Sequence, residues 1–303
     1  MADRRISFSQ YQMWKACPHR WKLNYIDRIN TYEPSVAALF GTAMHEALQE
    51  YVKCIYDNSI AEANKMNLNE ILQNGMKREY KKLLTESNNQ HFSNQEELAE
   101  YYNDGVQILD WFKAHRADFF LKKDFELVGI ELPINIIPLE SHPSIKLVGF
   151  LDLVLRNVST GDIYIYDFKT STKGWGQYQK SDKTKVSQLV LYKTYYAKQY
   201  NVDAETIHVE YLILKRKIDQ DAEYEAMKKR VQKFEPSNGI VSRNYVQKEL
   251  KEFITNNFTE DGEYRLDVVQ SADAGQNYSN CKYCWFNDKE EYCPKEQRNI
   301  MPF

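Results

Sequence analysis

The order of extended and helical segments is the feature that most limits the fold this chain can adopt. Three extended segments, at about 125–136, 145–156 and 162–169, precede a helical pattern at about 184–199 and a further extended segment at about 207–215. This order predicts an α/β protein in which helices pack on a central sheet. A Thr-Gly-Asp turn joins the second and third segments, so we expect those two strands to form a hairpin.

Helical periodicity accounts for most of the remaining sequence. Ser7 and Gln10 have the spacing of a capping box at the start of a first helix. The pattern between residues 43 and 122 predicts a helical subdomain, which we expect to lie beside a core at 124–217. Further helices are predicted at about 19–29, 42–56, 67–121, 222–233 and 241–255.

The composition is that of an ordinary folded protein. Hydrophobic residues make up 43% of the chain and charged residues 27%, which differs clearly from the composition of disordered chains. The sequence contains no run of about eighteen apolar residues and no secretory signal at its N-terminus. Five cysteines are too few for a disulfide framework and suit a reducing compartment. We therefore expect a cytoplasmic protein that does not enter a membrane.

Charge is unevenly distributed along the chain. The net charge is −3, but residues 1–30 carry +4 and residues 169–233 carry +6, so the remainder carries −13. Such asymmetry is compatible with a basic surface for a polyanion on an acidic body. Chance unevenness is the alternative interpretation of the same numbers.

The extended segment that ends in Asp167-Phe168-Lys169 is the most informative for chemistry. Alternation places Asp167 and Lys169 on the same face as the apolar side chains before them. Burying such charges is costly unless a cation and an anionic substrate compensate them. Asp152 near the end of the neighbouring strand supplies a second carboxylate, and carboxylates of this kind hold Mg²⁺ together with water and phosphate. A simple salt bridge is the alternative to a metal site.

Two helices contribute further polar residues. His45 lies in the segment Gly-Thr-Ala-Met-His-Glu of a predicted helix, and Gln188 and Tyr192 share one face of another because they are four residues apart. Taken alone, each is compatible with an ordinary packed histidine or a polar surface patch.

In this order, the four motifs resemble those of the RecB-like branch of the PD-(D/E)XK nuclease superfamily. That branch includes the AddB-type and CRISPR-adaptation-type iron–sulfur exonucleases and stand-alone phage nucleases. The resemblance implies a restriction-endonuclease-like core, a mixed central sheet flanked by helices, with a helical insertion and a C-terminal cysteine cluster. It spans almost the whole chain, so residues 1–303 are expected to form a single nuclease domain.

The resemblance also implies a role for each residue. His45, Asp152, Asp167 and the backbone carbonyl of Phe168 would hold Mg²⁺ or Mn²⁺. An imidazole ligand would favour Mn²⁺, since nitrogen suits softer cations. The catalytic set implied in this way is Asp152, Asp167, Lys169, Gln188 and Tyr192. Lys169 would orient or activate the attacking water, and Gln188 and Tyr192 would position metal-bound water and the DNA backbone.

Four cysteines form a second candidate metal site. Cys281, Cys284 and Cys293 lie close together near the C-terminus, and Cys17 precedes a proline near the N-terminus. Four thiolates can bind Zn²⁺ or a [4Fe-4S] cluster, and spacing alone favours zinc. The resemblance instead implies an iron–sulfur cluster that would join residues 1–30 to residues 270–303 as one subdomain. We expect its role to be structural.

The sequence therefore predicts a metal-dependent DNA exonuclease that acts on DNA ends or single strands. The alternatives are a structure-specific (flap) endonuclease and a catalytically silent DNA-binding subunit with a zinc or iron–sulfur staple. The resemblance is consistent with DNA recombination, repair or replication, with a partner protein, and with the host cytoplasm if a phage encodes the chain. No nucleotide-binding motif of the G-x-x-x-x-G-K-[ST] type occurs.

Overall fold

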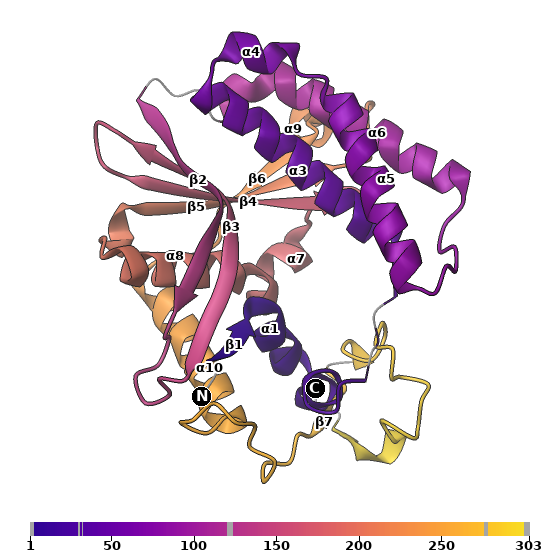
Figure 1. Ribbon diagram of the computed structural model, residues 1–303, viewed down its shortest axis with the longest axis vertical. Helices are drawn as coiled ribbons and strands as arrows, with labels where there is room; N and C mark the ends of the chain where they lie inside the picture. The colour runs from indigo at the N-terminus through magenta and orange to yellow at the C-terminus, as the bar shows by residue number, and fades with distance from the viewer. Residues whose placement is uncertain (1–2, 30, 32, 120–123, 276–277, 300–303) are drawn as a thin grey trace.

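A mixed six-stranded sheet forms the centre of the protein (Figure 1). The structure is a computed structural model that describes residues 3–29, 31, 33–119, 124–275 and 278–299. The strand order is β1-β3-β4-β5-β6, and β2 pairs with the other edge of β3. The strands are β1 (Arg4–Ser7), β2 (Phe125–Ile136), β3 (Ile145–Asn157), β4 (Ile163–Ser171), β5 (Ile207–Lys215) and β6 (Val231–Phe234).

The long strand β3 has two different partners along one edge. Its first part, residues 145–148, pairs in parallel with β1, and its last part, residues 153–156, pairs antiparallel with β4. Residues 149–152 between these parts have no ladder partner on that edge. Beyond Tyr166, β4 continues with its other edge paired to β5. Strands β3 and β4 therefore separate at this point, and we call the opening between residues 149–152 and 167–171 the fork.

One face of the sheet is covered by the helices α3 to α6 (Figure 1). Apolar residues of α3 recur at helical spacing, with Leu39, Phe40, Ala43, Ala47 and Leu48 among those fully buried. They pack with α5, α6 and the sheet residues Leu153, Leu155 and Phe168 in one hydrophobic cluster. The helices are α3 (Val36–Asp57), α4 (Ile60–Lys65), α5 (Leu68–Glu86) and α6 (Gln95–His115), followed by the short helix η1 (Arg116–Asp118).

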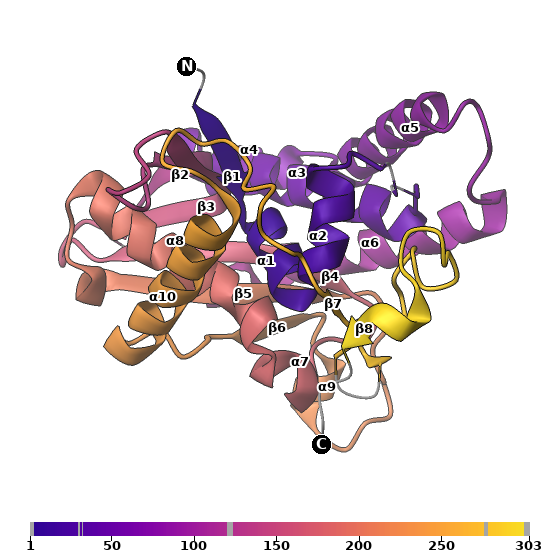
Figure 2. The same cartoon turned by 90° about the horizontal axis from the view of Figure 1, so that it is seen from below.

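The opposite face is covered by α1, α8 and α10 (Figure 2). The Ser7 hydroxyl accepts a hydrogen bond of 3.3 Å from the Gln10 amide at the start of α1, and Asp182 caps α8 in the same way. Leu189, Leu191 and Tyr195 of α8 pack on the sheet in a second hydrophobic cluster. These helices are α1 (Phe8–Ala16), α8 (Lys183–Tyr200) and α10 (Ile240–Asn257).

Short elements connect the layers and form the C-terminal segment. In both views the C-terminal segment lies beside α2, far from it in sequence (Figures 1 and 2). The connecting elements are α2 (Pro18–Tyr25), α7 (Gln177–Ser181), η2 (Ala204–Thr206), α9 (Glu225–Lys228), β7 (Ala272–Asp273), η4 (Lys295–Gln297) and β8 (Arg298–Asn299).

The architecture confirms the expected α/β, restriction-endonuclease-like core, including the hairpin of β3 and β4. The predicted helix at 222–233 is wrong, because only Glu225–Lys228 is helical and Val231–Phe234 pairs with β5. The helix predicted at 19–29 ends at Tyr25. The long helical pattern from 67 divides into α5 and α6, and its predicted end at 121 lies outside the described residues. The subdomain boundaries stay a prediction.

Candidate active site

The fork brings the two acids of the extended segments together. The last antiparallel pair of β3 and β4 is Leu153 with Tyr166, so Asp152 and Asp167 are the next residues on either side of the opening. The Phe168 amide has no partner on β3, and the Asp152 carboxylate accepts its hydrogen bond at 2.7 Å through Oδ2. The sequence motif thus lies where a backbone ladder stops and a side chain replaces the missing strand.

His45 enters the fork from the helical layer. Its Nδ1 atom lies 3.5 Å from Oδ2 of Asp152, and its ring contacts the ring of Phe168 edge to face. Burial lowers the pKa of His45, against the attraction of the Asp167 carboxylate. The imidazole is therefore neutral at pH 7, which is the form that can bind a cation.

Asp167 and Lys169 form an ion pair on the same face of β4. Oδ2 of Asp167 and Nζ of Lys169 are 2.6 Å apart, and Asp167 is only 3% exposed. Burial acts to lower the pKa of Lys169, but the Asp167 carboxylate outweighs it and the pKa is raised. Lys169 is thus a fixed positive charge at the edge of the opening.

Gln188 and Tyr192 reach the fork from α8. The Gln188 side-chain amide donates a 3.2 Å hydrogen bond to the Tyr192 hydroxyl. Burial and, to a smaller extent, the carboxylates of the fork raise the pKa of Tyr192 to about 12. The ring packs against Gly149, where an added Cβ would lie 3.0 Å from the hydroxyl oxygen. All the predicted side chains of the first site therefore lie around one opening.

Glu131 is a site residue that the sequence analysis missed. It lies on β2 opposite Asp152, between the pairs Ile130–Leu153 and Leu132–Leu151. Gln49 holds it in place by donating hydrogen bonds to its carboxylate at 2.6 Å and to the Asp152 carbonyl at 3.3 Å. Glu131 has a φ of 48°, a strained conformation for such a residue that is often found at functional sites. No motif in the sequence marks it, because its position follows from strand register.

The electrostatics of the fork are dominated by negative charge. Burial raises the pKa of Asp152 well above its ordinary value, and the like charge of Asp167 raises it further. Glu131 also raises the pKa of Asp152, while Lys169 and the hydrogen bond from the Phe168 amide lower it. The carboxylates therefore repel one another in a buried position, and an added cation would relieve that repulsion.

In the described part of the chain, no three His, Cys, Asp or Glu side chains are grouped closely enough to hold a metal ion. At the fork, Asp167 is instead paired with Lys169 and Asp152 with the Phe168 amide. A cation that uses both carboxylates would have to displace the Asp167–Lys169 ion pair.

The four predicted cysteine ligands line one small cavity between α2 and the C-terminal segment. None forms a disulfide. Two backbone amides, of Arg20 and Asp273, donate to Sγ of Cys17 at 3.5 and 3.4 Å. The guanidinium of Arg298 also borders the cavity and holds the Cys293 carbonyl at 2.8 Å. Burial nevertheless raises the pKa of the Cys17 and Cys281 thiols, against the effect of these donors and of Arg298. Among the described residues, the cysteines are not grouped as a metal site.

The sheet and the acid–acid–lysine group at the fork are those of an α/β nuclease core. The family model of the PD-(D/E)XK nuclease superfamily matches residues 5–293. The protein therefore belongs to the PD-(D/E)XK nuclease superfamily. A search of curated proteins found no match. Within the described residues, no helix has the length and apolar character needed to cross a membrane.

Proposed function

We propose that this protein is a metal-dependent deoxyribonuclease that hydrolyses phosphodiester bonds at DNA ends or in single strands. The observation that carries the proposal is the meeting of Asp152, Asp167 and Lys169 at the fork, with His45 3.5 Å from Asp152. A buried group of like charges has no stabilising role of its own. It is explained by a cation and a phosphodiester that complete the site.

The donor set fits a divalent cation of the magnesium or manganese type. Two carboxylates, from Asp152 and Asp167, together with the Phe168 carbonyl offer the oxygen ligands that these ions prefer. The neutral imidazole of His45 would complete the set and favour Mn²⁺. Such a cation would polarise the scissile phosphate and lower the pKa of a bound water.

The remaining residues would act on the substrate directly. Released from Asp167 by the cation, the Lys169 ammonium would lie free to stabilise negative charge on the phosphate and to orient the attacking water. The Tyr192 hydroxyl, with a pKa of about 12, stays protonated and can donate to a phosphate oxygen. Gln188 holds that hydroxyl in place.

A preference for ends or single strands is supported by the position of α3. This helix carries His45 into the fork, and α5 and α6 pack against it. A helical layer on one side of the opening restricts how a long duplex could approach. We propose exonuclease action on this basis.

We propose that the chain belongs to the RecB-like, AddB-type branch of the superfamily. The order of motifs and the cysteine set support this assignment. We propose that Cys17, Cys281, Cys284 and Cys293 hold a [4Fe-4S] cluster, with zinc as the alternative. The presence of all four cysteines in the lining of one cavity supports a metal held between the two segments.

The experiment that tests the function uses end-labelled linear DNA and closed circular DNA in parallel, with Mn²⁺ or Mg²⁺ and with EDTA. Exonuclease action degrades linear DNA, leaves closed circles intact and requires the metal. Cleavage of a flap substrate at an internal position would instead identify a flap endonuclease. Binding of DNA without cleavage under all conditions would identify a silent DNA-binding subunit and overturn the proposal.

A further inference from the structure

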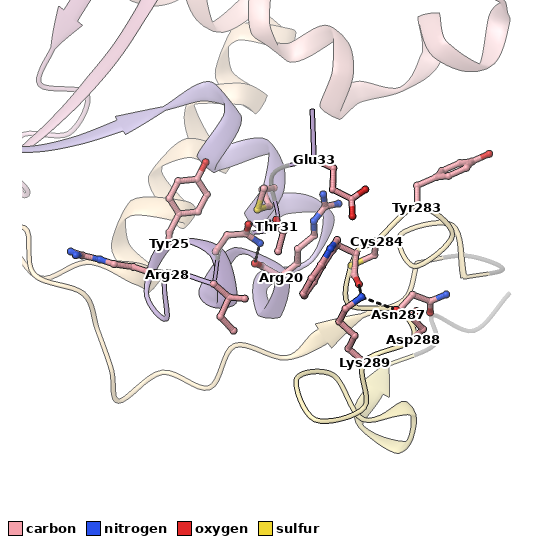
Figure 3. Close-up of a pocket in the computed structure, with 14 residues that line it drawn as sticks. Arg20, Tyr25, Arg28, Thr31, Glu33, Tyr283, Cys284, Asn287, Asp288 and Lys289 are labelled. Carbon is pink, nitrogen blue, oxygen red and sulfur yellow. Dashed lines mark hydrogen bonds and ion pairs between the residues drawn. The ribbon is translucent and has the colours of Figure 1, made fainter. Parts of the chain in front are cut away.

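Two cavities outside the fork lie next to each other. The larger, of about 990 Å³, lies between α2 with its following segment and the cysteine-rich C-terminal segment (Figure 3). The second, of about 650 Å³, lies between α1, α7 and the start of α8. Met13 and Arg20 line both cavities, so the two cavities adjoin at these side chains. We call the pair of adjoining cavities the α1–α2 groove.

The α1–α2 groove borders the helix that carries two residues of the fork. Thr184 lines its second cavity and lies on α8, one helical turn before Gln188. Residues four apart on a helix lie on the same face. The second cavity therefore borders the face of α8 that carries Gln188 toward the fork.

The groove is lined by two guanidinium groups and several aromatic rings, together with the acids Glu33, Asp182 and Asp288. The guanidinium groups of Arg20 and Arg28 have no ion-pair or hydrogen-bond partner among the residues that the structure describes. The lining also contains the rings of Tyr25, Tyr283 and Trp285. Lys289, by contrast, is 3.1 Å from Asp288 and stacks on the Trp285 ring, so it adds little free charge.

Guanidinium groups and aromatic rings in one groove are the combination that binds single-stranded nucleic acid. The cations contact successive phosphates, and each ring can stack on a base of any identity. A nucleotide or other small anion would require only one end of the groove. The two adjoining cavities together instead offer room for several nucleotides beside α8.

We infer that the α1–α2 groove is a binding track for single-stranded DNA that holds the strand beyond the scissile bond. This inference rests on the proposed nuclease function, because the fork supplies the end of the track. It assigns substrate binding to Arg20, Arg28 and Tyr283, none of which belongs to the fork.

The test compares DNA strands of different length. Arg20→Gln and Tyr283→Ala are assayed for cleavage of a single-stranded 20-mer and of a tetramer too short to reach the groove. We expect each variant to raise KM for the 20-mer about tenfold while KM for the tetramer and kcat stay unchanged. Affinity for DNA falls as the salt concentration rises. Loss of one phosphate contact in Arg20→Gln should make the slope of log affinity against log salt less steep by about 0.7.

Matched variants exclude general effects. Arg5→Gln and Tyr224→Ala change exposed residues outside the groove and should leave all values unchanged. Tyr283 is 84% exposed, so its removal should not affect folding. If Arg20→Gln fails to fold, Arg28→Gln at the end of the groove replaces it. Equal KM values of wild type and groove variants for the 20-mer would overturn the inference. An equal rise in KM for the 20-mer and for the tetramer would also overturn it.

A binding measurement separates this inference from the proposed function. Fluorescence anisotropy of a labelled single-stranded 20-mer is measured in EDTA. The chelator removes the divalent cation, so binding is measured without cleavage of the DNA. Weaker binding by the groove variants would support the track even if no cleavage of DNA were ever observed. Unchanged binding, or a preference for duplex DNA over the single strand, would contradict the track while leaving a nuclease at the fork intact.

Discussion

Asp152 and Asp167 bring two like charges into a buried part of the sheet. Burial and the charge of Asp167 raise the pKa of Asp152, and Lys169 neutralises only one of the two acids. In the absence of a cation, the charged form of Asp152 therefore costs folding free energy. Proteins keep destabilising buried charges of this kind where the charges are needed for function.

Asp152→Asn should stabilise the metal-free protein and abolish cleavage. The amide oxygen can still accept the hydrogen bond of the Phe168 amide, while the buried charge is removed. We expect the unfolding temperature in EDTA at pH 7.5 to rise by about 2 °C, the shift that about 1 kcal/mol produces in a domain of this size. Calorimetry and the DNA assay check both parts. A variant less stable than wild type in EDTA would contradict the interpretation of Asp152 as a strained charge.

The raised pKa of Asp152 also predicts how metal affinity depends on pH. A cation must displace the proton, so the affinity for Mn²⁺ should fall by up to tenfold per pH unit once the pH drops below that pKa. Over the same window the metal-free protein should gain stability from this group, because the folded state binds the proton more tightly than the unfolded state. Titrations with Mn²⁺ between pH 5 and 8 measure this. An affinity that stays constant down to the ordinary range of an aspartate would be inconsistent with the raised pKa.

At the scale of elements, the fork arises because β3 changes partners along one edge. The sequence predicted β3, β4 and their hairpin, since alternation and turn chemistry are local signals. It did not predict β1, because four residues before a helix cap carry too little pattern. Without β1, the sequence could not show that residues 149–152 lack a partner on the edge shared by β1 and β4, or that the chain forms a fork there.

Pairing at the edge of the sheet explains why the helix predicted at 222–233 was wrong. The segment 222–233 is rich in helix-forming residues, but Val231–Phe234 completes the sheet beside β5. Arg230, 7% exposed, donates to the Lys215 carbonyl at 3.3 Å and fixes the strand in place. Tertiary contacts override local propensity here. The same limit applies to Glu131, whose position depends on register rather than on any motif.

Gly149→Ala tests whether the fork positions Tyr192. The added Cβ would lie 3.0 Å from both Cε1 and the hydroxyl oxygen of Tyr192, so the ring must shift. We expect kcat to fall about tenfold or more, since a displacement of about 1 Å at a catalytic group is costly. Gly239→Ala is the matched control, because no atom lies within 4 Å of its added Cβ. Equal activity of both variants would show that Tyr192 has no positional role.

At the scale of the whole molecule, one cavity joins the two ends of the described chain. Cys17 follows α1, while the other three cysteines belong to the C-terminal segment. The Asn280 side chain donates to the Ala16 carbonyl at 2.6 Å, which adds a direct contact between the two segments. A metal held by these cysteines would close almost the whole chain into a loop and restrict the unfolded state.

Cys281→Ser should therefore affect folding before it affects chemistry. We expect loss of bound iron or zinc, a lower unfolding temperature and reduced soluble yield, with kcat of the remaining folded protein near that of wild type. Cys54→Ser is the control, since Cys54 lies in α3 away from the cavity. Metal analysis and thermal unfolding measure the effect. A metal-free Cys281→Ser protein as stable as wild type would show that the cysteines have no structural metal.

We propose that one divalent cation binds at the fork between Asp152, Asp167 and His45, with Lys169 beside it. Isothermal titration with Mn²⁺ tests this most directly, in wild type, Asp167→Asn and Lys169→Met. We predict that wild type binds Mn²⁺, that Asp167→Asn loses this binding, and that Lys169→Met binds at least as tightly, because the competing ammonium is gone. Undiminished Mn²⁺ binding by Asp167→Asn would contradict the account.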